Sequence, residues 1–325
     1  MSEHDRRSAV AAPPPAGFKV GAYARLAKLD IFDYYLGLLV VWSLLSAQAR
    51  FEGRVLATLA LFLLAEVCTV AATVSFDDVT GYRDGSDAFN YGPDAPARRL
   101  ARKPLLTGEL TVPEAVRFRW LALAAAALSA GAAAAVAPFQ PMWAIIVTAA
   151  SLAAAVQWSW GLKLSHRGFN EVILAGVGVA WLLAPYGLLT GSASGFVAVQ
   201  AVVFGMGPLL FGVYSNTNDV AGDAKVGRRT AATMLSARGN ALFIAGLSVL
   251  QVLLIVGAPL VGLAPWWFLL AMLPVIVLRV RQLHIGLVRH DILTARKAGI
   301  STHRMTVALL VAANLVVGLV GGGVR

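Results

Sequence analysis

Two acidic stretches in this sequence have residue types and spacings that could bind a divalent metal ion. The first, "DDVTGYRDGSD" at 77–87, contributes four carboxylates: Asp77, Asp78, Asp84 and Asp87. The second, "NDVAGDAKVGRRT" at 218–230, places Asp219 and Asp223 four residues apart. On a helix this spacing puts both carboxylates on one face, where like charges repel. A divalent cation between them would remove that repulsion, so both stretches are candidate metal sites.

Each stretch also has a simpler interpretation as a solvated loop of mixed charge. Asp219 and Asp223 could pair with the basic residues that follow them and bind nothing: Lys225, Arg228 and Arg229. The first stretch, however, adjoins an apolar run, where an ionised carboxylate is costly and usually functional. Two acidic stretches on one side of a membrane favour a shared site over two unrelated loops.

The basic residues near both stretches favour a phosphate-containing ligand. Arg98, Arg102 and Lys103 follow the first stretch, and Arg228 lies in the second. Mg²⁺ prefers a few carboxylates together with water and phosphate oxygens, and arginine often binds phosphate bidentately. An apolar helix bundle beneath such a site would take a long hydrocarbon tail. We therefore expect the ligand to be a prenyl diphosphate.

The elements that must position these residues are membrane helices. Hydrophobic residues make up 58% of the chain and charged residues only 14%, with a mean hydropathy of +0.72, whereas soluble domains carry about 25% charge. A spanning helix needs about 20 mostly apolar residues. That criterion gives nine candidate spans: 32–48, 54–76, 119–137, 141–157, 171–191, 195–214, 239–262, 264–281 and 305–322. The predicted fold is an all-α polytopic membrane protein, with about nine transmembrane helices around a central apolar cavity.

The positions of the basic residues predict an orientation. If nine spans alternate, 24 of the 27 Lys and Arg residues fall on one side. The positive-inside rule then makes the N-terminus and both acidic stretches cytoplasmic. This placement also explains the net charge of +10, so no nucleic-acid partner is expected. The lone Cys68 excludes a disulfide within the chain and a cysteine metal site.

The N-terminal residues differ in composition from the rest of the chain. Residues 1–18 are rich in polar residues, proline and alanine, and we expect a disordered cytoplasmic tail there. Residues 19–325 are expected to form a single transmembrane domain. No secretory signal is evident, so the membrane would be the plasma membrane if the protein is prokaryotic. The sequence leaves the oligomeric state open.

With both stretches in view, residues 20–322 resemble the UbiA-type intramembrane prenyltransferases. In the branch of that family that prenylates dihydroxynaphthoate, the first signature is similar to NDxxDxxxGxD. Asp77 stands at the Asn, Asp78 at the next position, and Asp87 at the end. Gly81 replaces the usual third-position Asp, and Asp84 is a candidate to take over its role. "RKPLLTG" at 102–108 is similar to the family's RPLxxG stretch.

The second stretch resembles the same branch more closely. Its signature is similar to NNxxDxxxDxxxGKxTL, and six positions of this chain align without a gap: Asn216, Asp219, Asp223, Gly227, Arg228 and Thr230. The chain departs from it at Ser215, at Arg228 in place of Lys, and at Ala231. "WGLKLSHRGFNE" at 160–171 is a weaker match to a third family stretch, from which the prolines are missing.

The resemblance implies a function and a role for each candidate residue. The expected activity is Mg²⁺-dependent transfer of a prenyl group from an isoprenyl diphosphate to an aromatic, quinone-precursor-like acceptor within the bilayer. The implied magnesium ligands are Asp78, Asp84, Asp87, Asp219 and Asp223. The implied diphosphate-stabilising residues are Arg102, Lys103, Lys163 and Arg228. Further substrate contacts are expected from Asp77, Arg98, Asn216 and Tyr214.

Two alternatives remain open at this point. Some members of the superfamily are membrane terpene cyclases, which ionise the same diphosphate and fold the chain onto itself, and the departures at Gly81 and in 160–171 leave this possible. A transporter or channel has the same composition, but it predicts charged residues in the middle of its spans. Here the acidic residues cluster at the ends of spans. Trp158, Trp160 and Tyr214 are candidates for stabilising a carbocation by cation–π contact, although tryptophans near span ends are often interfacial anchors.

Overall fold

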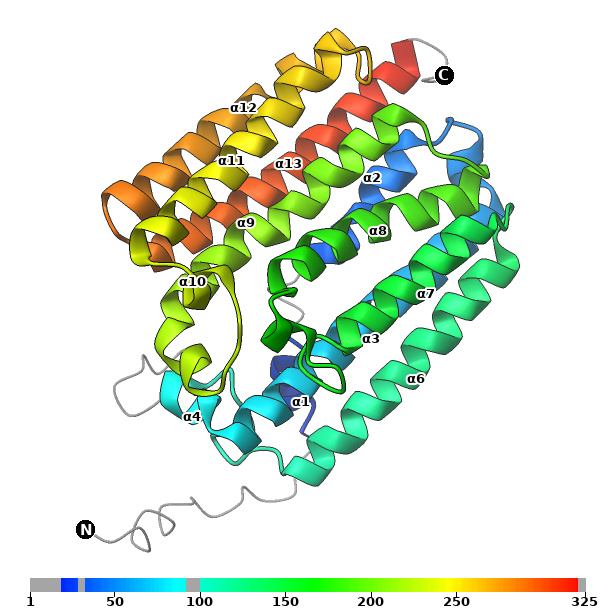
Figure 1. Ribbon diagram of the computed structural model, residues 1–325. Helices are drawn as coiled ribbons and strands as arrows, with labels where there is room; N and C mark the ends of the chain where they lie inside the picture. The colour runs from blue at the N-terminus through cyan, green and yellow to red at the C-terminus, as the bar shows by residue number, and fades with distance from the viewer. Residues whose placement is uncertain (1–18, 29–32, 92–99, 321–325) are drawn as a thin grey trace, which may run out of the picture.

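The computed structural model describes residues 19–28, 33–91 and 100–320, and these residues form an all-helical bundle without a strand (Figure 1). The first half contains α1 (Val20–Ala27), η2 (Asp33–Leu36), α2 (Gly37–Leu44), η3 (Ala49–Phe51), α3 (Gly53–Asp84), α4 (Ser86–Asn90), α6 (Val112–Val136) and α7 (Met142–Val156). The second half contains η4 (Leu164–Arg167), α8 (Asn170–Thr190), α9 (Gly195–Lys225), α10 (Ala231–Met234), α11 (Ala237–Leu260), α12 (Trp266–Leu283), η5 (His284–Val288) and α13 (Ile292–Val320).

Each of the nine predicted spans contains a helix, but the helices differ in length. Among the described residues, seven are long and apolar enough to cross a membrane: α3, α6, α8, α9, α11, α12 with η5, and α13. The apolar helices at 33–44 and 142–156 are shorter. Since a bilayer core is about 30 Å thick and a helix rises about 1.5 Å per residue, these two do not reach across it alone. The membrane fold is therefore confirmed, and the count of nine stays a prediction.

Local sequence signals determine where several helices begin or end near the two acidic stretches. Thr111 and Glu114 form a reciprocal capping box at the start of α6, with a proline in its first turn. Gly85, with φ of 82°, adopts the left-handed conformation that ends α3. As a result α3 continues well past the apolar run and carries Asp77, Asp78 and Asp84 in its last turns. Asp87 lies in the separate helix α4.

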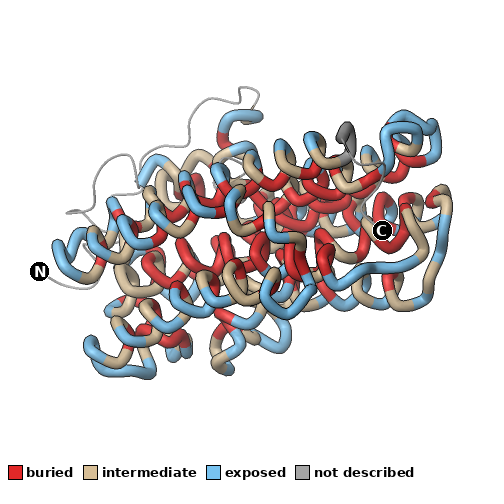
Figure 2. The backbone as a smooth tube through the Cα atoms, turned by 90° about the horizontal axis from the view of Figure 1, so that it is seen from above, coloured by how far each residue is buried: buried red, intermediate tan, exposed pale blue. Residues whose placement is uncertain are grey.

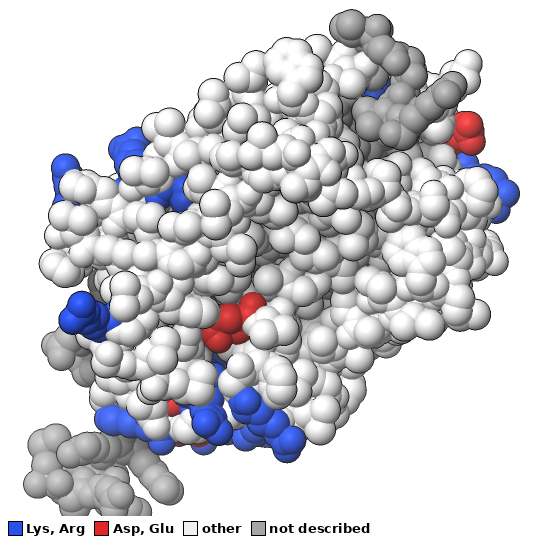
Figure 3. All heavy atoms as spheres, turned by 45° about the horizontal axis from the view of Figure 1, so that its top comes forward, with Lys and Arg blue, Asp and Glu red and all other residues white. Residues whose placement is uncertain are grey.

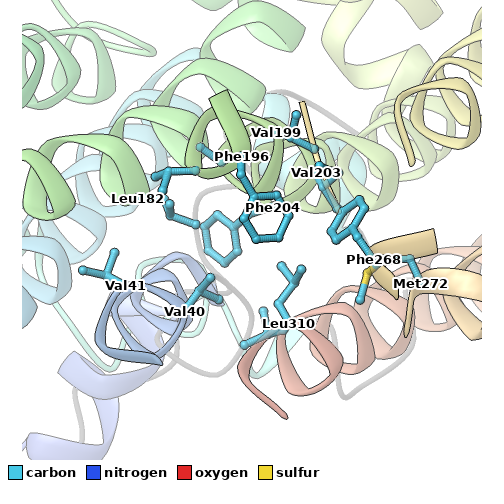
Figure 4. Close-up of a cluster of buried hydrophobic side chains, with 14 of the residues drawn as sticks. Val40, Val41, Leu182, Phe196, Val199, Val203, Phe204, Phe268, Met272 and Leu310 are labelled. Carbon is cyan, nitrogen blue, oxygen red and sulfur yellow. The ribbon is translucent and has the colours of Figure 1, made fainter. Parts of the chain in front are cut away.

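The main apolar core lies around α9. This helix packs against α8, α11 and α13, and 83% of its apolar window is buried. Phe204 from α9 meets Val40, Leu182 and Leu310 from α2, α8 and α13 in the largest buried cluster (Figure 4). Buried residues follow the inner faces of the helices, while exposed residues lie outside and at the ends (Figure 2).

The short helices α1, α4 and α10 gather at the same end of the bundle, opposite the C-terminus (Figure 1). Ion pairs hold this end together: Lys19 Nζ lies 2.8 Å from Glu114 Oε1, and Arg25 pairs with Glu109. Most of the face in Figure 3 is uncharged, with basic atoms along its lower edge and at its sides and a patch of acidic atoms near its centre. The broad uncharged surface suits a bilayer around the bundle. The predicted tail at 1–18 lies outside the described residues.

Candidate active site

The two acidic stretches meet at this end of the bundle, although more than a hundred residues separate them in sequence. Arg228, just after α9, joins them: its Nη2 donates to Asp77 Oδ1 at 2.7 Å, and its Nε lies 3.8 Å from Asp223 Oδ1. The helix α4 also packs on α9. A Cβ atom at Gly222 would lie 2.1 Å from Asn90 Oδ1, so the absence of a side chain there permits the contact. Close packing of α4 on α9 therefore holds the two stretches together.

Two lysines neutralise the first stretch. Asp78 is 1% exposed and accepts hydrogen bonds from Lys28 Nζ at 2.5 Å and Lys103 Nζ at 2.8 Å. Lys103 also donates to Asp87 Oδ1 at 2.6 Å. Burial alone would lower the pKa of Lys103, but Asp78 and Asp87 raise that pKa well above its usual value. Lys103 is therefore a buried cation with a fixed charge beside two carboxylates.

Asp87 fills the space beside Gly81. A Cβ atom on Gly81 would lie 2.8 Å from Asp87 Cγ, closer than real contacts of this kind. The missing side chain at Gly81 thus lets the Asp87 carboxyl approach α3. Burial raises the pKa of Asp87 to about 6, with Lys103 opposing that shift and Asp78 adding to it. The missing side chain at Gly81 therefore leaves room for Asp87, and the role of Asp84 as a substitute ligand stays a prediction.

Asp84 and Lys163 lie at the exposed edge of the site. Asp84 is exposed and accepts the backbone N–H of Ser86 at 3.0 Å. Lys163 is exposed at a turn, with φ of 48°. Burial lowers the pKa of His166, Arg228 and Lys163 lower it further, and Asp84 opposes them. These charges therefore act on one another around His166, which favours the neutral imidazole near pH 7.

The second stretch is supported by the segment before α8 and by the first turn of α8. Asn216 Nδ2 donates to Glu171 Oε1 at 3.0 Å, and the same oxygen accepts the backbone N–H of Ala231 at 3.0 Å. The backbone N–H of Arg229 donates to the Ser165 carbonyl at 3.1 Å. The weak third match at 160–171 thus forms direct contacts with the second stretch. Glu171 fixes Asn216 and the start of α10 at once.

Asp223 and Asp219 differ in their surroundings. Asp223 is 5% exposed, and its nearest cation is Arg228. Asp219 is half-buried and accepts from Asn218 Nδ2 at 2.6 Å. Burial lowers the pKa of Arg228, but Asp77 and then Asp223 raise it above its usual value, so this guanidinium stays charged. The second stretch therefore places the buried Asp223 beside a permanent cation, whereas Asp219 is more accessible.

An apolar cavity of about 60 Å³ lies beside the charged groups. Its walls come from η2, α3, α8 and the end of α7, and they include Thr73, Val74, Trp158 and Ile173. Trp158 connects the two regions because its ring lines the cavity and lies 5.2 Å from the Arg228 guanidinium carbon. Thr73 is one helical turn from Asp77. The cavity thus lies between η2, α3, α8 and the end of α7.

The other aromatic candidates lie elsewhere. Tyr214 is buried among Leu209, Ile244 and Ala295, and it does not line the cavity. Trp160 packs with Phe76 and Trp120 at ring-centroid distances of 5.1 and 5.2 Å. The sequence position of these two residues does not specify which way their side chains point. The structure therefore does not bring Tyr214 to the site.

Arg102 and Arg98 belong to the segment between α4 and α6. Arg102 is half-buried there, and Arg98 lies outside the described residues. Lys28, in contrast, contacts Asp78, although its position in the sequence does not predict a role at the site. No local pattern distinguishes it from the other basic residues near α1, so only the fold identifies it.

The donor set fits magnesium with a diphosphate, although it does not form a complete metal cage. Among the described residues, no three His, Cys, Asp or Glu side chains form a metal-binding group. Mg²⁺ usually takes only one or two carboxylates and fills its other positions with water and phosphate oxygens. Asp78 Oδ2 is buried without a hydrogen-bond partner among the described residues. Asp78, Asp87 and Asp223 can therefore supply oxygens when a diphosphate completes the coordination.

Solved structures share this fold. The apo structure of a UbiA homologue from Aeropyrum pernix K1 has a TM-score of 0.63 and 15% identity, covering 88% of this chain and 97% of that one. A UbiA homologue from Archaeoglobus fulgidus bound to DMAPP and Mg²⁺ has a TM-score of 0.60 and 15% identity, covering 88% and 99%. A second structure of the latter is bound to GPP and Mg²⁺, with a TM-score of 0.58. Both of these complexes contain Mg²⁺ together with the diphosphate.

A third match concerns digeranylgeranylglyceryl phosphate synthase, with a TM-score of 0.61 and 14% identity, covering 91% of this chain and 99% of that one. No curated protein is similar enough in sequence to match the chain. A model of the UbiA prenyltransferase family matches residues 36–310. On the strength of that match, this protein belongs to the UbiA prenyltransferase family.

Proposed function

We propose that this protein transfers a prenyl group from an isoprenyl diphosphate to an aromatic, quinone-precursor-like acceptor within the membrane, in a reaction that depends on Mg²⁺. The DMAPP and GPP complexes of the Archaeoglobus fulgidus homologue support the class of donor. The spacing of the second acidic stretch, which resembles the dihydroxynaphthoate branch, supports the acceptor. We place the site on the cytoplasmic side, on the basis of the distribution of Lys and Arg.

One observation carries the proposal. Arg228 binds Asp77 of the first stretch, lies beside Asp223 of the second, and stacks over the Trp158 ring that lines the cavity. A single side chain therefore joins both carboxylate groups to an apolar space. A ligand with an anionic head and a hydrocarbon tail matches this arrangement.

The buried cations have a clear role in such a reaction. Ionisation breaks the allylic C–O bond and leaves its electron pair on the diphosphate. Lys103 and Arg228 keep their charges, and both can stabilise the negative charge that develops there, usually the largest catalytic term. Lys28 adds a third cation beside Asp78, and Arg102, Arg98 and Lys163 remain predicted contacts. Bound Mg²⁺ would neutralise further charge on the diphosphate oxygens, held by Asp78, Asp87, Asp219 and Asp223.

The cavity has the properties that a carbocation requires. Its lining is apolar and aromatic, which excludes water that would otherwise quench the cation. Trp158 lies closest to the charged groups, and a desolvated cation–π contact of this kind contributes about 2 kcal/mol. The acceptor carbon would then form the new bond and lose a proton. Asn216 and Asp77 would hold the site in shape through Glu171 and Arg228.

The cavity lining also favours a second candidate, a membrane terpene cyclase. Of its ten lining residues, only Thr73 and Tyr34 carry a hydroxyl, and Tyr34 donates its hydrogen bond to the Leu174 carbonyl. This lining offers few polar groups to orient an aromatic acceptor. A cyclase needs no acceptor, because the cation attacks a double bond of its own chain.

A product screen distinguishes the two candidates. Purified protein is incubated with Mg²⁺ and prenyl diphosphates of several lengths, with and without aromatic acceptors, and products are identified by mass spectrometry. A prenylated acceptor supports the transferase, whereas a cyclic hydrocarbon or alcohol formed without acceptor supports the cyclase. Turnover that is unchanged in Asp219→Ala and Asp223→Ala would reject the metal-ligand role of the second stretch.

A further inference from the structure

We propose that Arg83 and Arg119 bind the phosphate of an anionic membrane phospholipid. The two arginines lie where the end of α3 packs against the start of α6, at the end of the bundle that carries the acidic stretches. This lipid site is separate from the proposed reaction and does not depend on the proposed function.

Arg119 is a buried cation without an anionic partner in the described part of the chain. It is 6% exposed, and its Nε is buried without a hydrogen-bond partner. Aromatic rings hold it instead, since the guanidinium carbon lies 4.4 Å from the Phe76 ring centroid and 5.9 Å from that of Trp120. Cation–π contacts offset part of the cost of burying a charge, but a buried charge usually has an ionic partner as well. Arg119 therefore lacks the anion that its burial requires.

Arg83 adds a second positive charge at the same place. Phe76 and Arg83 are seven residues apart on α3, so they lie on one face of that helix, and Arg119 contacts this face. Arg83 is exposed, and its charge acts on Arg119. Like charges on facing helices repel each other, and among the described residues no carboxylate pairs with either arginine. An anion between the two would remove this repulsion.

Arg119 lies at the predicted boundary between the apolar core of the bilayer and its headgroups. The predicted spans end at residue 76 and begin at residue 119, and Phe76 and Arg119 are in contact. Trp120 and Trp160 pack on Phe76, and Trp120 is 42% exposed. Tryptophan is enriched at membrane interfaces, where its ring lies at the level of the headgroups. The phosphate of a phospholipid lies at this same level.

The surface next to Trp120 favours a lipid over a soluble anion. Ala124 and Ala127 follow Trp120 by four and seven residues, so the three lie on one face of α6, and all three are exposed. Leu121 and Leu128, on the neighbouring face, are exposed as well. The surface thus stays apolar from Trp120 toward the middle of α6. A phosphate bound at the arginines leaves its acyl chains against this surface, which a soluble anion would not cover.

The chemistry of the two side chains specifies an anionic headgroup. Guanidinium groups bind phosphate oxygens through charge-assisted hydrogen bonds. Phosphatidylglycerol carries a net negative charge, whereas phosphatidylcholine adds a cation that the two arginines would repel. Binding should therefore depend on the charge of the headgroup, and it should weaken as the salt concentration rises.

The test titrates the delipidated protein, in a neutral detergent, with phosphatidylglycerol, phosphatidylcholine or inorganic phosphate, and measures bound ligand by native mass spectrometry. We expect phosphatidylglycerol to bind at least about tenfold more tightly than phosphatidylcholine, a difference of about 1.4 kcal/mol, and inorganic phosphate to bind more weakly than either lipid. Arg119→Met keeps a long apolar side chain without the charge and should abolish the preference. Arg83→Gln should reduce it by about threefold, because the charge of Arg83 is exposed and screened.

Arg117→Gln is the matched control. Arg117 is exposed on the same helix, but it lies two residues from Arg119 and so points to the opposite side of α6. Its replacement should leave the preference unchanged. An equal loss in Arg117→Gln and Arg83→Gln would show that general surface charge attracts the lipid, and it would overturn the site.

Thermal unfolding provides a second measurement, which also serves if Arg119→Met does not fold. A ligand that binds the folded protein raises its unfolding temperature, so phosphatidylglycerol should stabilise the wild type more than it stabilises Arg83→Gln. The same rise in both proteins would contradict the proposal. Equal binding of the two lipids would overturn the anionic headgroup, and inorganic phosphate that binds as tightly as phosphatidylglycerol would overturn the lipid.

Discussion

Arg228 and Arg279 show two ways in which this protein holds a guanidinium group away from water. Arg228 lies among carboxylates at the end of the bundle, bound to Asp77 and close to Asp223. Arg279, on α12, is 1% exposed and its partners are amides. Its Nε donates to Gln251 Oε1 at 2.9 Å and its Nη1 donates to Gln282 Oε1.

The surroundings of Arg279 are those of a packing device. Gln282 Nε2 donates to the Leu210 carbonyl at 3.0 Å, which links α12 to α9, and Gln251 links both to α11. A glycine makes room for this network: a Cβ atom at Gly299 would lie 2.4 Å from Gln282 Nε2. Close approach of helices at small residues, with polar side chains bonded across them, is typical of membrane bundles.

The two arginines differ in whether their partner side chains can also bind a metal ion. Carboxylates that hold Arg228 are also good ligands for Mg²⁺, so a metal and a diphosphate can take over part of that network. Glutamine amides around Arg279 bind three helices to one another and have no comparable second partner. A buried ionisable residue in a membrane is functional by default, and this pair shows that its partners decide whether the function is chemical or structural.

The largest predicted effect is on activity at Arg228. Arg228→Met should lower kcat/KM for the prenyl diphosphate by about 10²–10³-fold, the loss typical when one charge-stabilising donor is removed. Steady-state kinetics of diphosphate release measures it. Arg228→Lys is the matched control, because lysine keeps the charge and stands at this position in the family signature. Loss of activity in Met but not in Lys supports the electrostatic role, and near-normal activity in Met contradicts it.

The second prediction concerns stability rather than chemistry. Gln251→Met removes an acceptor from the buried Arg279 guanidinium and should cost about 1.5–3 kcal/mol of folding free energy, as for other hydrogen bonds to charged groups. Thermal unfolding of the detergent-solubilised protein should shift to lower temperature. The specific activity of the folded fraction should stay unchanged. A large drop in activity without a loss of stability would mean that Arg279 also belongs to the reaction.

The third prediction tests the space beside Gly81. Gly81→Ala places a methyl group where the Asp87 carboxyl lies, so Asp87 should move away from Lys103. We expect kcat/KM to fall about tenfold, equivalent to one weakened charge-assisted contact of about 1.4 kcal/mol, together with a higher Mg²⁺ requirement. Gly131→Ala on α6, where a Cβ atom meets nothing within 4 Å, is the matched control. A fully active Gly81→Ala protein would show that Asp87 need not occupy this space.

Much of the fold follows directly from the sequence, because a spanning helix needs a long apolar run and such runs are visible without any packing information. The continuation of α3 to Asp84 follows too, since no proline interrupts it and Gly81 is the only glycine between its first residue and Gly85. The reach of the two short spans across the bilayer was less predictable. Helix α7, Met142–Val156, agrees with the predicted span 141–157 within one residue at each end, but it is shorter than a spanning helix.

The sequence predicts the site residues that lie in the two acidic stretches, but not those contributed by other segments. Asp77, Asp223 and Arg228 were expected near one another and lie together. The Lys28 contact to Asp78 and the place of Tyr34 in the cavity lining depend on how α1 and η2 fold back onto α3 and α8, which no local spacing encodes. Tyr214 is the opposite case, a residue that the sequence predicts at the site and the structure places elsewhere. It lies on the correct helix but faces α11 and α13, because helix rotation is set by tertiary packing.

The smallest predicted effect is at Asp84, and it sharpens the contrast between exchangeable and peripheral carboxylates. Asp84 is exposed and bonds to the backbone of Ser86, so its charge is screened by water and only partly felt at the site. Asp84→Asn should therefore change kcat/KM by only about twofold, whereas Asp87→Asn, which alters the partner of Lys103, should cost at least about tenfold. Magnesium titrations of both variants measure the difference. If Asp84→Asn raised the Mg²⁺ requirement as strongly as Asp87→Asn, Asp84 would be a metal ligand in the working enzyme, and the space at Gly81 would no longer explain the altered signature.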